Sequence, residues 1–147
     1  MIRRLILAAA LVSTAALTGC ATGPKYSEMS STIPAMKAGE GRVYFFRSDS
    51  MLGAAIQPEV RLNNVVVGES KPGGFFYVDR PAGSFSAAAS TETEKTLSFT
   101  LDAGETKYVR TSPSMGLLVG RIQLELEDPT KAMAEIQKLS FTPLVKK

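Results

Sequence analysis

The sequence predicts an all-β domain, an antiparallel β-sandwich of seven to eight short strands followed by one C-terminal helix. Three observations support this class. Short runs of β-forming residues recur after residue 41, and turn residues separate these runs at intervals of about 8–12 residues. Near the end of the chain, apolar residues instead fall at helical spacing.

The first twenty residues have the three parts of a secretory signal. Arg3 and Arg4 give a positive start, residues 5–17 form an apolar stretch, and small residues precede Cys20. The apolar stretch is shorter than the roughly 20 residues that span a bilayer. The run Leu17-Thr18-Gly19-Cys20 resembles the lipobox of bacterial lipoproteins. That resemblance implies lipid on the Cys20 thiol, cleavage before Cys20 and acylation of the new amine; the alternative is a signal peptide with an incidental cysteine.

A lipid on Cys20, the single cysteine of the chain, would hold the protein at a membrane. One acyl chain binds reversibly and two signals anchor stably, so three chains such as palmitate would make the attachment effectively permanent. Ala21 stands where an Asp commonly signals inner-membrane retention in Gram-negative bacteria. We therefore expect an outer-membrane lipoprotein that faces the periplasm, with the cell surface as the alternative. With Cys20 lipidated, no disulfide is available to the domain.

Residues 20–41 are rich in Gly, Pro and Ser and lack a sustained apolar period, which predicts a flexible tether that carries the lipid. A short helix around residues 28–37 is the alternative, although Pro34 would interrupt it. The chain thus divides into a signal peptide (1–19), a lipidated tether (20–41) and a β-sandwich domain with its C-terminal helix (42–147).

Strand signals fill most of the chain after residue 41. The run 42–47 carries aromatic residues on both faces, which predicts a strand covered on both sides. Asn63 and Asn64 tolerate positive φ and separate two apolar runs, a pattern typical of a tight hairpin. Further strands are expected at 75–79, 84–89, 96–101, 106–111 and 122–127.

One helix is expected after these strands. Asp128 can accept hydrogen bonds as an N-cap, and Pro129 suits the first helical position. Ala132, Ile136 and Leu139 then follow at helical spacing, together with Met133. We expect this apolar stripe to dock on the sandwich, and binding of a partner is the alternative.

Charge and composition exclude several function classes. Removal of Arg3 and Arg4 with the signal lowers the basic count from 17 to 15, against 14 acidic residues, so the mature net charge is about +1. This balance, with no basic stripe, argues against nucleic acid as a partner. The chain has no histidine, which removes the commonest general base and the usual transition-metal ligand.

Carboxylate pairs remain as candidates for acid–base chemistry, and the Glu127–Asp128 end also for calcium binding. Notable among them are Glu92 with Glu94, and Glu125 with Glu127 and Asp128. A solvated sheet face explains their alternation with apolar residues. The sequence therefore predicts no enzyme, no catalytic residue, no metal and no cofactor apart from the covalent lipid on Cys20.

Two connections are apolar and contain glycine, whereas surface loops are normally polar. Their apolar residues form the candidate interaction surface, which comprises Met51, Leu52 and Ile56 in the first connection and Met115, Leu117, Leu118 and Val119 in the second. One interpretation folds these loops over an open end of the sandwich or into buried, bulged strands. The other makes them a shared hydrophobic patch that docks a partner or an acyl chain. Arg110 and Arg121 could form a polar rim or pair with acidic neighbours.

An ordered set of short motifs carries a family resemblance over about residues 40–127. The motifs are 42–47, 60–64 with Gly68, 71–78, 81–83, 103–110 and 114–116. Together they resemble a family of small bacterial lipoproteins known only as a domain of unknown function. The Asn-turn-Gly, Gly-Phe and Pro-x-Gly steps are also similar to PEGA-type modules, although Asn64 stands where such hairpins usually carry Gly. The resemblance implies a transthyretin-like or PEGA-like sandwich in the envelope, with no assigned activity.

Three functions remain to be compared. The first is a non-enzymatic, outer-membrane-anchored lipoprotein that acts as an interaction or accessory module with an envelope protein partner. The second is a carrier of a small apolar ligand or lipid, which would need a pocket between loops 51–56 and 115–120. The third is a hydrolase, which would need convergent polar groups in a cleft.

Overall fold

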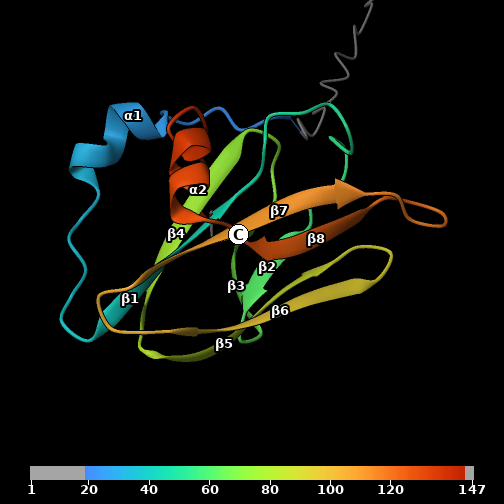
Figure 1. Cartoon of the computed structure of the whole chain (residues 1–147). Helices are drawn as coiled ribbons and strands as arrows, with labels where there is room; N and C mark the ends of the chain where they lie inside the picture. Colours follow the sequence, from blue (N-terminus) through green and yellow to red (C-terminus); the bar gives the residue numbers. More distant parts are fainter. Residues whose placement is uncertain (1–18, 145–147) are drawn as a thin grey trace, which may run out of the picture.

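The computed structural model describes residues 19–144, so most of the predicted signal peptide lies outside the described residues. The strands are β1 (Glu40–Phe46), β2 (Glu59–Leu62), β3 (Val65–Glu69), β4 (Gly74–Pro81), β5 (Gly83–Ser90), β6 (Glu94–Leu101), β7 (Thr106–Ser114), β8 (Arg121–Leu126) and β9 (Ser140–Phe141). The helices are α1 (Tyr26–Met29), the 3-10 turn η1 (Ser30–Thr32) and α2 (Pro129–Ile136). Figure 1 shows them in place.

The strands form two sheets that pack as a sandwich, which confirms the predicted fold class. One sheet has the order β8-β7-β1-β4-β9, and the other has the order β3-β2-β5-β6. Two pairs are parallel rather than antiparallel as predicted, namely β1 with β7 and β4 with β9. The chain leaves the first sheet after β4 to build the β5–β6 hairpin of the other sheet. β7 therefore returns beside β1 in the same direction.

β1 lies at the centre of the five-stranded sheet and is covered on both sides, as predicted. Val43 and Phe45 face the other sheet and belong to the core between the two layers. Tyr44 and Phe46 face outward into a second, aromatic cluster with Phe75. A strand buried on both faces explains why the sequence shows a continuous apolar run here rather than an alternation.

The hairpin between β2 and β3 turns on Asn63 and Asn64, which have φ angles of 47° and 66°. Both lie in the left-handed region that a two-residue hairpin of this kind requires, and asparagine reaches that region at low cost. The predicted turn is therefore confirmed.

Helix α2 also begins where the sequence predicts. The Asp128 carboxylate accepts hydrogen bonds from the backbone N–H groups of Thr130 (3.0 Å) and Lys131 (3.1 Å). Ala132 and Ile136 are buried against the outer aromatic cluster, so the apolar stripe docks on the sandwich. No helix within residues 19–144 is long and apolar enough to cross a membrane.

The segment before β1 differs from the flexible tether that the sequence predicts. It forms α1 and η1, and Tyr26 and Met29 pack on the aromatic cluster of the five-stranded sheet. Backbone bonds hold its start to the C-terminal part of the chain: Tyr26 N–H donates to the Leu139 carbonyl (3.1 Å), and Phe141 N–H donates to the Pro24 carbonyl (2.8 Å). The helix ends before Pro34, in agreement with the helix-breaking role expected of that residue.

Candidate functional site

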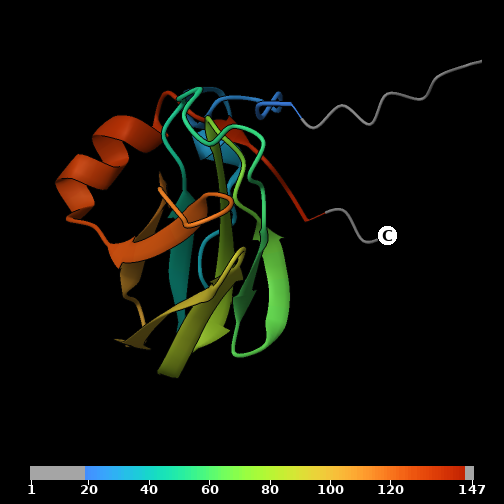
Figure 2. The same ribbon diagram turned by 90° about the vertical axis from the view of Figure 1, so that its right-hand side faces the viewer.

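The two apolar connections project from the same side of the sandwich. The first links β1 to β2 and the second is the β7–β8 hairpin tip; Figure 2 views the molecule from the side on which both project. Their side chains are exposed, from 57% for Val119 to 91% for Leu118, with Met51, Leu52, Met115 and Leu117 between these values. Ile56 differs, because it is half-buried. The tips are therefore neither buried strands nor a cover over the open end of the sandwich.

The two connections meet at their bases. A Cβ atom added to Gly120 would lie 2.0 Å from the Ile56 Cδ1 atom, and one on Gly53 would lie 2.7 Å from Pro113 Cβ. A larger residue at Gly53, whose φ is 64°, would be strained and would press on the Pro113 ring, and one at Gly120 would displace the end of the Ile56 side chain. Between the connections lies a hollow of about 230 Å³, lined by Leu52, Gly53, Ile56, Pro113, Ser114, Met115 and Gly120. The structure thus joins the two loops into one surface, which we call the apolar patch: Met51, Leu52, Met115, Leu117, Leu118 and Val119.

A buried arginine fixes the first connection from below. Arg47 is 2% exposed and follows directly after β1. Its Nη1 atom donates to the carbonyls of Ile56 (2.6 Å) and Ser70 (3.1 Å), and its Nη2 atom donates to the carbonyl of Gly53 (2.7 Å). Burial lowers the pKa of the Arg47 guanidinium from its ordinary value. Three backbone carbonyls, rather than a carboxylate, therefore compensate the charge and set the course of the loop.

A carboxylate fixes the second connection. Glu92, in the β5–β6 turn of the other sheet, accepts hydrogen bonds from the backbone N–H of Leu117 (2.9 and 3.1 Å) and of Leu118 (3.3 Å). Arg121 lies beside the same carboxylate, with 3.6 Å between its Nε atom and Glu92 Oε2. In the sequence, Glu92 is a candidate for acid–base chemistry, but the structure uses it to hold the hairpin tip.

Arg110 takes part in a separate ionic cluster and does not form a rim around the patch. Its Nε atom lies 3.0 Å from Glu127 Oε2, and its Nη2 atom lies 2.6 Å from Glu135 Oε2. Ser48 donates to Glu135 and accepts from Arg110 at 2.9 Å. Partial burial raises the pKa of Glu135, but hydrogen bonds from Arg110 and Ser48 outweigh it and hold the pKa below its usual range. The cluster ties α2 to β7 and to the chain after β1.

Cys20 is exposed and lies near the first connection. The next residue, Ala21, is fixed by a hydrogen bond from its N–H to the Pro72 carbonyl (3.1 Å). The Gln57 side-chain amide donates to the Gly19 carbonyl (3.2 Å) and to the Ala54 carbonyl (2.9 Å). One side chain therefore links the peptide bond before Cys20 to the base of the apolar loop. The sequence gives no signal for this role of Gln57.

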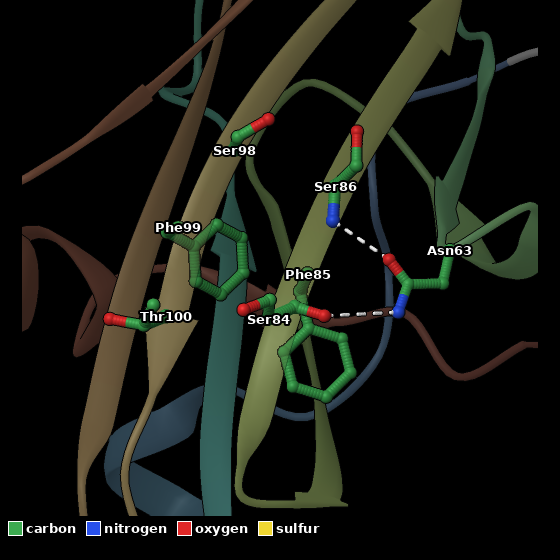
Figure 3. Close-up of a pocket in the computed structure, with 7 residues that line it drawn as sticks. All are labelled: Asn63, Ser84, Phe85, Ser86, Ser98, Phe99 and Thr100. Atoms are coloured by element: carbon green, nitrogen blue, oxygen red, sulfur yellow. Dashed lines mark hydrogen bonds between the residues drawn. The ribbon is translucent and has the colours of Figure 1, made fainter.

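A second hollow, of about 510 Å³, lies over β5 and β6 and is open to solvent. Figure 3 shows its lining, which consists of Asn63, Ser84, Phe85, Ser86, Ser98, Phe99 and Thr100. The Asn63 amide spans the β5 backbone, since it accepts from the Ser86 N–H (2.8 Å) and donates to the Ser84 carbonyl (3.3 Å). The lining holds no titratable side chain, so this hollow offers no group for acid–base chemistry.

Of the other candidate carboxylates, Glu125 is exposed, Asp128 caps α2, and two more are engaged in ion pairs. Glu94 pairs with Arg61 at 2.5 Å, and Glu127 accepts from Arg110. Within residues 19–144, no three acidic or cysteine side chains gather in a way that could hold a metal ion. What the described residues bring together is thus an apolar surface that Arg47 and Glu92 hold in place, with its first loop near Cys20.

Comparison with known proteins gives a family and one relative. The family model described as "Protein of unknown function (DUF2846)" matches residues 37–121. An uncharacterized protein of Haemophilus influenzae strain Rd is 28% identical over 146 residues, which cover 95% of this chain and 86% of the relative. No solved structure gives a significant match. The matched region includes both apolar loops with Arg47 and Glu92, and it excludes α2.

Proposed function

This chain belongs to the DUF2846 family of proteins of unknown function, and we propose that it is a non-enzymatic lipoprotein anchored in the outer membrane. On this proposal it acts as an interaction or accessory module of the bacterial envelope. The lipid on Cys20 supplies the anchor, and the sandwich presents a contact surface to an envelope protein or to the membrane.

The apolar patch is the single observation that carries this proposal. Six exposed apolar side chains share one surface, although water contact with apolar area is unfavourable and contiguous patches usually mark interaction sites. The buried guanidinium of Arg47 and the carboxylate of Glu92 hold the backbone beneath it. A surface that the fold both exposes and fixes in shape suits recognition.

The sheet edges offer a second contact surface. β6 and β8 each pair with one neighbour only, so each leaves a row of backbone groups unpaired along its outer side. Such edges accept an added strand from another chain. Thr96 on β6 and Gln123 on β8 are exposed at these edges.

A carrier of a small apolar ligand is the second candidate, and the hollow between the two loops favours it. Its lining is almost wholly apolar, from Leu52 and Ile56 on one side to Pro113 and Met115 on the other. Its volume of about 230 Å³ falls below the roughly 300–1,000 Å³ of usual ligand sites. The contact-module function is therefore the better supported of the two.

In-cell experiments test the anchor and the module separately. For the anchor, Cys20→Ser should abolish the acyl mass on the mature N-terminus and release the protein from the membrane fraction.

For the module, a photo-crosslinking amino acid at Thr96, Gln123 or Leu118 should give a discrete protein or lipid adduct. Ala103, in the turn between β6 and β7, is the matched control position. Equal, diffuse labelling from all four positions would contradict a contact function.

A further inference from the structure

We infer that the apolar patch rests on the lipid bilayer into which the acyl chains of Cys20 insert. The inference builds on the proposed lipidation and goes beyond it, because it assigns a lipid surface as the occupant of the patch and fixes the orientation of the sandwich on the membrane. The residues concerned are those of the patch, together with Cys20 and Gln57.

The lipid attachment point at Cys20 lies close to the first apolar loop. Ala21 is bonded to the Pro72 carbonyl, so the chain cannot swing freely directly after Cys20. Gln57 then bridges the Gly19 carbonyl and the Ala54 carbonyl of the first apolar loop. The acyl chains therefore begin beside the loop that carries Met51 and Leu52, and not at the end of a long tether.

The chemistry of processing preserves this bridge. Hydrolysis of the Gly19–Cys20 peptide bond frees the Cys20 amine. Transfer of an acyl group from a membrane phospholipid to that amine forms a new amide and leaves a lysophospholipid. The new acyl carbonyl takes the place of the Gly19 carbonyl, which accepts from the Gln57 amide at 3.2 Å. Gln57 is thus placed to hold the first atoms of the amide-linked chain against the apolar loop.

The hairpin tip has the properties that a bilayer interface demands. Residues 115–120 carry no charged side chain, and neither do residues 51–57. Unpaired backbone groups are costly in lipid, and Glu92 already accepts from the N–H groups of Leu117 and Leu118. Interfacial segments bind in proportion to the apolar area that they bury. Leu117 and Leu118, exposed by 87% and 91%, supply that area.

The arrangement of the two loops also favours a flat occupant such as a bilayer over a ligand that fits a narrow groove. Both tips project on the side of the molecule that faces the viewer in Figure 2, with the β1–β2 connection above the β7–β8 hairpin. Two neighbouring tips, the first of them beside the lipid attachment point, can enter one bilayer together. A protein partner is the competing occupant, and the experiment below separates the two.

The test uses the full, lipidated chain in vesicles of phosphatidylethanolamine and phosphatidylglycerol. Because Cys20 is the single native cysteine, Leu118→Cys and Leu52→Cys each give one free thiol for a bimane label. Ala103→Cys is the control, because Ala103 lies at the opposite end of β7 from the hairpin. With a rise of roughly 3.3 Å per residue along the strand, the two labelled positions are some 30 Å apart. Brominated acyl chains should quench the labels at Leu118 and Leu52 at least about twofold and leave the control unchanged. Aqueous iodide should show the reverse order.

Three other results would overturn the inference, and they are distinguishable. Intact mass without an acyl group on Cys20 would overturn the proposed anchor together with the inference. An acylated protein whose Leu118 label behaves like the Ala103 label would overturn the bilayer contact alone. A Leu118 label that is open to iodide in vesicles and shielded in intact envelopes would assign the patch to a protein partner instead.

Discussion

Two apolar surfaces lie outside the core of this sandwich; other segments cover one of them, and the other is exposed to solvent. On the outer face of the five-stranded sheet, Tyr44 and Phe75 are covered by α1 and α2, and the Phe141 ring packs beside Phe75. On the apolar patch, Leu117 and Leu118 face solvent. The chain thus possesses covering segments and uses them at one surface while it leaves the other open. Exposure of the patch is therefore a property of the fold and not a lack of chain to cover it.

The two surfaces also differ in what holds them. Aromatic contacts stabilise the outer face, such as Tyr44 stacked on Tyr108 at 5.5 Å and Tyr26 edge-on to Phe75 at 5.6 Å. Polar groups hold the patch from beneath through Arg47 and Glu92, and its apolar side chains bury little area. Substitutions in the aromatic outer face should therefore lower the free energy of unfolding. Substitutions of Arg47 or Glu92 should loosen the loops, and substitutions at the exposed tips should leave the stability unchanged.

The largest effect is expected for Phe75→Ala on the outer face. Phe75 is fully buried among Tyr26, Tyr44 and Phe141, and large-to-small changes of this kind cost about 3–5 kcal/mol of unfolding free energy. Urea denaturation should show the loss as a lower midpoint with an unchanged slope. Leu126→Ala, at a side chain 44% exposed, should cost less than about 1 kcal/mol. Equal losses at the two positions would show that burial of the Phe75 ring does not set the cost.

The next effect is expected at the support of the first loop. Arg47→Met fills similar space but leaves the carbonyls of Gly53, Ile56 and Ser70 without this donor. Unpaired buried acceptors cost about 1–3 kcal/mol. Amide hydrogen exchange should rise across residues 51–58 more than in β2. Arg61→Met removes an exposed ion pair with Glu94 and should cost about 1 kcal/mol or less. Unchanged exchange in the loop of the Arg47 variant would show that the loop does not depend on the guanidinium.

These contrasts also show which parts of the molecule local sequence could predict. The Asn63–Asn64 turn and the cap of α2 at Asp128 depend on neighbouring residues only, and both are confirmed. The order and direction of strands depend on long connections, so the parallel pairing of β1 with β7 left no local signal. The same holds for the packing of Tyr26, whose backbone partner is Leu139 at the other end of the chain.

The candidate site divides in the same way. The apolar character of residues 51–56 and 115–120 is visible in composition, and the structure brings the two loops together. The sequence identifies Arg47 only as a charged residue at the end of a strand. Its burial is compensated by the carbonyls of Gly53, Ile56 and Ser70, whose placement around one guanidinium only the folded structure reveals. Gln57 acts through two backbone carbonyls, and such a contact has no signature in residue type.

A smaller and pH-dependent effect is expected where α2 is tied to the sheet. The pKa of Glu135 lies below its usual range because of Arg110 and Ser48, so the folded state binds fewer protons than the unfolded chain. Its contribution is complete above the unfolded pKa of roughly 4.3 and is lost as pH falls through the folded pKa. The stability difference between the native protein and Glu135→Gln should therefore shrink between about pH 5 and pH 3 from a plateau of about 1 kcal/mol or less. A difference that stayed constant with pH would show that the carboxylate charge contributes nothing there.

The smallest effect on stability is expected at the tips themselves. Leu117→Ser with Leu118→Ser keeps the backbone N–H groups that donate to Glu92, whereas aspartate would place new carboxylates beside Glu92. Because both leucines are almost fully exposed, the free energy of unfolding should change by less than about 0.5 kcal/mol. The same double variant should still lose contact with its occupant, so lipid or partner labelling at Leu52 should fall while the urea midpoint stays fixed. A drop in midpoint as large as that of Arg47→Met would mean that the tips are part of the folded core, and the open surface would then be structural rather than functional.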